Sequence, residues 1–281
     1  MINGCCDLRG SWPYQDFPST SEIDAFLQNS TSQPLTWTGI IAPNKYDIKR
    51  AKDLLSTYNG RIINLKTHLA HIYGKPAVWT SYSRRTRNRI TEAESKYSVH
   101  EESFTADLVQ LSERLQADLI RYKSIPHISL PDSDHFQAIA NPDVIPPHRQ
   151  RCMILRNKIN NNSEGLILLL QDSDENIWHM HSFLVGSQAR KDFGSMLLFH
   201  AAVEQWGSKG EIWFGGQPSC TENNGIFTFK SRFSNHQAPA YLLCLDLQPE
   251  KLDSIRKQYP VYNWLPDYRN PEDELKRLIV R

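Results

Sequence analysis

The sequence of 281 residues predicts an α/β protein with a mixed, mostly antiparallel sheet flanked by helices. One observation is the order of elements after residue 98, which runs β–α–α–β–β–β–α–β–α–β. Another is a pair of polar segments, "NNNSEG" (160–165) and "DSDEN" (172–176), which separate three apolar runs and predict two hairpins. Three antiparallel strands then lead into a helix and into a strand that can lie parallel to the third.

The N-terminal part carries weaker signals. Residues 1–35 are rich in Ser, Thr, Pro and Gln and have few periodic apolar positions, so we expect an irregular lead-in. Residues 36–75 have the pattern of a strand, a helix and a second strand. These segments predict a reduced α/β lobe at residues 1–78, followed by a larger domain at residues 79–281.

The larger domain opens with a basic helix at 81–97 and a strand at 98–104. Residues 106–123 have leucines at helical spacing, and residues 131–142 predict a short helix bounded by prolines. The elements that follow are strands at 151–157, 164–171 and 176–185, a strong helix at 191–207, a strand at 211–216, a short helix at 225–234, a strand at 241–248 and a helix at 249–259.

Composition excludes several classes of protein. The formal net charge is +1, so no global attraction favours DNA or a membrane surface. The five cysteines lack a CxxC spacing, which argues against a disulfide scaffold or a zinc site and for a reducing compartment. The longest aliphatic run, 165–170, is too short to span a membrane, and the N-terminus lacks a signal-peptide pattern. We therefore expect a cytoplasmic protein.

Three short motifs, in this order, resemble those of one family. They are "RRTRNR" (84–89), "RKDFGS" (190–195) and the strand end "WFGG" followed by "GIFTFKSRF" (225–233). With the element order, they resemble the GNAT acyltransferases, and among these the Fem-like and BioF2-like branch with two GNAT-like lobes. The resemblance implies a GNAT-like domain after a truncated first lobe. It also implies an N-acyltransferase that moves an acyl group from acyl-CoA to the amine of a small or conjugated acceptor.

The resemblance also implies where the donor binds. In such enzymes the pantetheine runs along the third central strand, and the pyrophosphate lies at the start of the next helix, where free N–H groups favour an anion. The cofactor-binding residues implied here are Val185, Arg190, Lys191, Gly194 and Ser195. Only one glycine is present in this loop, so a purely structural helix start is the alternative.

Lys230 is the first candidate for catalysis. On a helix it lies beside a face formed by Ile226, Phe229 and Phe233, so it either extends to solvent or enters a cleft. The match to "FK" in the family motif implies the cleft. There its ammonium group would reach either the reacting carbonyl or a donor phosphate, and would stabilise the negative charge that develops in the reaction.

His179 and His181 are candidates for the general base, because an unperturbed imidazole titrates near neutral pH. Strand alternation predicts that both point to the same face as Phe183 and Val185. Two histidines packed in the sheet are the alternative. No further ligand at a suitable spacing completes a metal site, so we expect no metal.

The substrate-binding candidates lie in two of the family motifs. Gly215 and Gly216 end a strand and let a ligand approach the backbone, and Phe229 precedes the candidate lysine. Arg84 and Arg85 belong to the basic helix, which is either a solvated face or a clamp for phosphate oxygens.

Two other functions stay open. One is an aminoacyl-tRNA-dependent aminoacyl transferase. The short first lobe and the absence of a long helical hairpin insertion disfavour it, so tRNA is not the favoured partner. The other is a binding module that kept the fold and lost the chemistry. No Ser-His-Asp or Cys-His order is present, so we expect direct attack by the acceptor amine rather than a covalent enzyme intermediate.

Overall fold

The computed structural model describes residues 7–10, 20–29, 36–41, 45–73, 78–123, 133–171, 177–207, 209–214 and 225–250. These residues divide into two compact units. One holds the described residues up to Leu69 and from Ala238 onward, and the other those between Ala70 and Gln237. The division at residues 78 and 79 stays a prediction.

The first unit is a small sheet with two helices. Its strand order is β1 (Asp7–Gly10), β2 (Thr36–Ile41), β9 (His236–Asp246) and β3 (Asn59–Tyr73). β1 pairs with β2 in parallel, and β2 pairs with β9 antiparallel. A Cβ at Gly60 would lie 2.2 Å from the carbonyl oxygen of Cys244, so β3 and β9 approach each other closely only because residue 60 is glycine.

The expectation of an irregular lead-in at residues 1–35 is wrong for residues 7–10, which form β1, and for residues 20–29. The latter form α1 (Thr20–Asn29), whose Ile23 is 2% exposed and packs with Ala51 and Leu54 of α2 (Lys45–Thr57). The Tyr58 hydroxyl donates to Oδ1 of Asp24 at 2.7 Å, which ties the two helices together. A short helix has little periodicity of its own, and tertiary packing stabilises it.

The strand predicted at 241–248 forms β9, and it pairs with β2. The register runs from Thr36 opposite Asp246 to Ile41 opposite Tyr241. This part of β9 therefore joins the first unit, although the sequence placed it in the domain at residues 79–281. The helix expected at 249–259 lies almost wholly outside the described residues.

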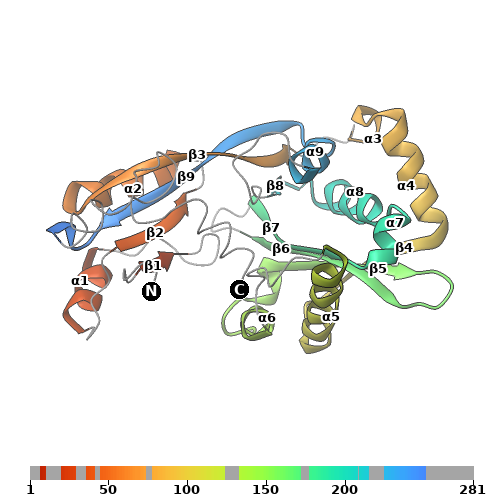
Figure 1. Cartoon of the computed structure of the whole chain (residues 1–281), viewed down its shortest axis with the longest axis horizontal. Coiled ribbons are helices and arrows are strands. Elements are labelled where there is room, and N and C mark those ends of the chain that lie inside the picture. Colours follow the sequence, from red (N-terminus) through yellow and green to blue (C-terminus); the bar gives the residue numbers. More distant parts are fainter. Residues whose placement is uncertain are drawn as a thin grey trace. The chain divides into compact units, whose positions relative to one another are not determined.

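The second unit contains the mixed, mostly antiparallel sheet that the sequence predicts (Figure 1). The strands are β4 (Tyr97–Glu102), β5 (Gln150–Asn157), β6 (Ser163–Gln171), β7 (Ile177–Val185) and β8 (Glu211–Trp213). They run in the order β8-β7-β6-β5-β4, and the last residues of β3 pair with β8. Both hairpins are confirmed, as is the parallel pairing of β7 with β8.

Helices cover both faces of this sheet. α8 (Gly194–Trp206) packs on one face with α4 (Arg84–Lys96) against it, and α5 (Ala106–Lys123) and α6 (Ser133–Ala140) lie on the other (Figure 1). Shorter helical segments are α3 (Val78–Ser81), η1 (Pro147–Arg149), α7 (Ser187–Lys191) and α9 (Gly225–Ser231). The main core lies between α8 and the sheet and is aromatic and aliphatic.

The helix predicted at 191–207 is α8, which begins at Gly194, and a separate short helix that the sequence did not predict, α7, precedes it. The break between them is at Phe193, whose φ of 61° is left-handed and ends α7 before α8 begins. Asp192 at the break accepts hydrogen bonds from Lys96 at 2.5 Å, from Gln188 at 2.8 Å and from the Tyr97 hydroxyl at 3.2 Å. These contacts hold the break in place.

Candidate functional site

The edge of β7 that faces β8 is the central feature of the candidate site. β6 pairs with β7 as far as Val185. Within the described residues, β8 pairs with only the start of β7, from Ile177 opposite Glu211 to His179 opposite Trp213. The backbone of β7 from Met180 onward is therefore free of β8 over the part of the chain that the structure describes.

A β-bulge in β7 lies just beyond the last pair with β8. Leu168 pairs with Ser182, but Leu169 pairs with Met180, so His181 is an extra residue in the ladder. A bulge bends its strand and increases its twist. The bend comes where the described pairing of β7 with β8 ends.

The bulge also corrects the expected orientation of side chains on β7. Trp178 and Phe183 both contact α8, with ring centroids 5.3 Å from Trp206 and from Phe199 respectively, although they are an odd number of residues apart. In a regular strand such residues point to opposite faces. The prediction that His181 shares a face with Phe183 and Val185 is therefore wrong.

The two histidines lie on the face covered by α5 and α6. His181 lies 6.2 Å from the ring of Phe136 on α6, and burial lowers its pKa to about 4. His179 is buried and its ring lies 6.1 Å from that of Trp213. An imidazole with a pKa of about 4 is neutral at pH 7 but is a weak proton acceptor, because a general base works best with a pKa near the operating pH.

Lys230 lies on α9, which packs on the α8 face of β7. The neighbouring Phe229 stacks on Phe183 with ring centroids 5.8 Å apart and planes at 21°. It also contacts Phe199 at 5.2 Å and Phe233 at 5.4 Å. The end of β7 therefore contacts α9 through the side chain of Phe183. Lys230 directly follows Phe229, the residue of α9 that makes this contact.

Burial lowers the pKa of Lys230 from 10.5 to about 8. At pH 7 about nine in ten molecules still carry the ammonium charge. A charged group held in a poorly solvated place stabilises nearby negative charge more strongly than one in bulk water. Ile226, by contrast, is 44% exposed, so only Phe229 and Phe233 of the expected apolar face pack inward.

The residues expected at the donor phosphates are already engaged. Arg190 pairs with Asp118 of α5 at 3.7 Å, and the same carboxylate accepts a hydrogen bond from the backbone N–H of Ser187 at the start of α7. The chain's own anion thus occupies this helix start and offsets the charge of Arg190. Lys191 is exposed and Val185 is buried in the core, so the five residues do not form one exposed anion site.

Gly194 has a packing role. A Cβ there would lie 2.7 Å from Cδ2 of Leu155 and 2.9 Å from the carbonyl oxygen of Ala189. The glycine lets α8 approach β5 and α7, which matches the structural alternative. Ser195 is half-buried beside it.

The arginines of α4 divide into two groups. Arg84 and Arg85 are exposed, whereas Arg87 donates to the carbonyl oxygen of Tyr82. The guanidinium of Arg89 lies over the ring of Phe193, 4.8 Å from its centroid. Arg232, which follows α9, lies near enough to Arg89 to affect its titration. Arg232 was not among the candidates predicted from the sequence, although it lies inside the family motif "FKSRF".

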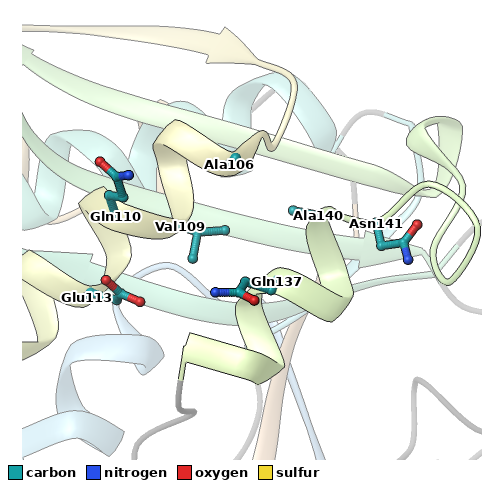
Figure 2. A pocket seen from close by; sticks show the side chains of 7 residues that line it. All are labelled: Ala106, Val109, Gln110, Glu113, Gln137, Ala140 and Asn141. Atoms are coloured by element: carbon teal, nitrogen blue, oxygen red, sulfur yellow. The ribbon is translucent and has the colours of Figure 1, made fainter.

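Gly215 and Gly216 lie outside the described residues, so their candidacy stays a prediction. A separate groove of about 530 Å³ lies between α5 and α6 (Figure 2). Its walls carry Gln110, Glu113 and Gln137. None of the candidate site residues lines it.

Comparison with known proteins supports the fold rather than a particular activity. No family model matches the sequence, and no curated protein matches it. Among solved structures, FemX superposes with a TM-score of 0.59 at 9% identity, over 88% of this chain and 82% of FemX. L-PGS from Bacillus licheniformis gives 0.55 at 12% identity, over 83% of this chain and 74% of that one.

A third neighbour is the C-terminal domain (DUF2156) of a protein described as a lysylphosphatidylglycerol synthetase from Agrobacterium fabrum. It gives a TM-score of 0.53 at 13% identity, over 83% of this chain and 75% of that one. The chain has a GNAT-like fold, and it shares this fold with these three proteins. Within this GNAT-like fold, β7 and α8 are the strand and helix between which the sequence analysis placed the donor. No described helix is both long enough and apolar enough to cross a membrane.

Proposed function

We propose that the protein is an N-acyltransferase that transfers an acyl group from acyl-CoA to the amine of a small or conjugated acceptor. The observation that carries this proposal is that, among the described residues, β8 pairs with β7 only as far as His179, while Lys230 lies on the helix packed beside β7. An extended pantetheine arm has amide groups that can pair with exposed strand backbone. Strand addition of this kind is a common way in which an extended ligand binds beside a strand.

In the proposed reaction the acceptor nitrogen attacks the thioester carbonyl carbon. The carbonyl oxygen becomes an oxyanion, the C–S bond then breaks, and the thiolate leaves and takes up a proton. Lys230, charged at pH 7, would stabilise the oxyanion electrostatically. The acceptor must bind as the free amine or lose its proton to water or to a base. The low pKa of His181 makes it a poor candidate for that step in the free protein.

A second candidate is an aminoacyl-tRNA-dependent aminoacyl transferase. It is favoured by the similarity of fold to FemX, whose TM-score of 0.59 exceeds those of the other two neighbours described. It uses the same carbonyl chemistry, because an aminoacyl ester and a thioester both pass through an oxyanion. The two candidates differ in the donor alone.

Donor binding separates these candidates. Purified protein would be studied by native mass spectrometry and by thermal unfolding with acetyl-CoA or aminoacyl-tRNA. The favoured proposal expects a CoA adduct, stabilisation by acetyl-CoA, and acetylation of amines in a radiolabel assay. Stabilisation and transfer with aminoacyl-tRNA but not acetyl-CoA would favour the second candidate, and neither donor binding would overturn both.

A further inference from the structure

Three arginines from two separate elements converge near the start of α8. Arg85 and Arg89 are one helical turn apart on α4, and Arg232 follows α9. Arg85 and Arg232 are exposed, and Arg89 is half-buried. We call Arg85, Arg89 and Arg232 the arginine cluster.

Aromatic packing brings the two elements together. Phe233, next to Arg232, lies in edge contact with Tyr82, with ring centroids 5.3 Å apart, and Tyr82 directly precedes the cap of α4. Phe233 is 1% exposed and also packs on Phe199 of α8 at 4.9 Å. The end of α9 is therefore anchored against the basic end of α4, and the position of Arg232 follows from a buried contact.

The ring of Phe193 holds the third member. Arg89 lies 4.8 Å from its centroid, and this residue has a left-handed backbone fixed by the contacts of Asp192. A guanidinium stacked on a ring loses little further freedom when it binds an anion, because its plane is already oriented. The donors of Arg89 therefore stay at one place near the start of α8.

The cluster carries uncompensated positive charge. None of its members forms an ion pair with a described residue. Glu92 is an acidic residue whose charge raises the pKa of Arg89, but its carboxylate also lies 3.8 Å from the Lys96 ammonium. Burial lowers the pKa of Arg89, and the charges of Arg85 and Arg232 lower it further. Like charges held close together by packing destabilise the free protein, and a bound anion removes that cost.

We propose that the arginine cluster binds the phosphate groups of a small phosphorylated co-substrate. Guanidinium forks match phosphate oxygens in geometry and charge, and donors from two elements suit a diphosphate better than a single carboxylate. The identification of this co-substrate as the CoA donor rests on the proposed function. In that case the cluster performs the role that the sequence assigned to Arg190 and Lys191.

Calorimetry with inorganic pyrophosphate tests the cluster independently of any reaction. Replacing one charged donor removes charge-assisted hydrogen bonds, so we expect Arg232→Gln to weaken pyrophosphate binding about tenfold or more. Arg89→Gln with Arg232→Gln should abolish it. Arg121→Gln, an exposed arginine on α5, is the matched control and should bind as wild type does. Circular dichroism establishes that each variant is folded.

A second measurement separates this inference from the proposed function. If the enzyme uses acyl-CoA, Arg232→Gln should raise KM for acetyl-CoA about tenfold and leave KM for S-acetylpantetheine, which lacks the nucleotide and its pyrophosphate, unchanged. If neither compound is a substrate, the proposed function fails while pyrophosphate binding still tests the cluster. Equal pyrophosphate affinity in wild type, Arg232→Gln and the double variant overturns the inference. If the protein binds tRNA more tightly than pyrophosphate, and the same variants lose tRNA binding, the assignment of the arginine cluster to a small molecule is overturned.

Discussion

Replacing Lys230 with methionine should have opposite effects on stability and on activity. Burial lowers the pKa of this lysine from 10.5 to about 8. Each pKa unit corresponds to about 1.36 kcal/mol, so keeping the ammonium charged in the folded protein costs up to about 3 kcal/mol. The side chain is only half-buried and solvent screens part of this cost. We therefore expect Lys230→Met to raise the free energy of unfolding at pH 7 by about 1–3 kcal/mol.

The sign can be checked by varying pH. The unfolded chain keeps this proton up to about pH 10.5, whereas the folded protein releases it above about pH 8. Between these values the unfolded state binds more protons, so this lysine makes wild-type stability rise with pH through that window. Lys230→Met lacks this rise. The stability difference between the two proteins should therefore be largest below pH 8 and disappear toward pH 10.5.

The assay combines urea unfolding at pH 7 and pH 9.5 with steady-state turnover on acetyl-CoA. Loss of a preorganised charge at the oxyanion should lower turnover by about 100-fold or more. Lys230→Arg keeps a positive charge and should retain part of the activity. Lys52→Met, an exposed lysine on α2, is the control and should change neither quantity. A Lys230→Met variant that is less stable than wild type at pH 7, and that turns over at the wild-type rate, would refute the role assigned to Lys230.

Four further outcomes follow from the same contacts. Turnover of wild type should fall above about pH 8 as Lys230 loses its proton, and a rate that stays constant to pH 10 would exclude a charged lysine from the mechanism. Gly194→Val should lower the free energy of unfolding by about 1–3 kcal/mol, because its side chain meets Leu155; an unchanged melting temperature would contradict this. Phe229→Ala should lower the free energy of unfolding by about 2–4 kcal/mol, because it removes three ring contacts. A loss of turnover in variant protein that is still fully folded would indicate that α9 has moved. Deleting His181 removes the bulge and should weaken acetyl-CoA binding about tenfold or more, whereas His181→Asn keeps the bulge and should bind normally; similar affinities in the two would show that the bulge does not matter.

Local signals were enough to predict most of the second unit. The hairpin turns on either side of β6 are polar segments between apolar runs, and each adjoining strand pairs with its neighbour in sequence. The parallel placement of β8 follows because α8 returns the chain along the sheet. Each of these features depends on residues close together in sequence. Pattern and propensity therefore sufficed.

The features that shape the site depend on contacts between distant residues. The break before α8 depends on Asp192, which Lys96 and Tyr97 bind from another element. The bulge at His181 depends on the pairing of β6 with β7, and "HMHSF" gives no local sign of an extra residue. The lysine was found from a motif, but its helix packs through Phe229 on Phe183, which lies on the α8 side because of the bulge.

Asp118 explains why a phosphate would bind at Arg89 and Arg232 rather than at Arg190. Its carboxylate accepts from the start of α7 and pairs with Arg190, so a phosphate entering there would displace a carboxylate already held by a charged partner. Arg89 and Arg232 have no such competitor among the described residues, and each is placed by an aromatic contact rather than by an acid. An incoming diphosphate gains more where positive charge is unopposed than where it must replace an existing pair. The sequence predicted positive charge beside the start of α8 from Arg190 and Lys191. In the structure, the unopposed positive charge in that region comes from Arg89 of α4 and from Arg232 after α9.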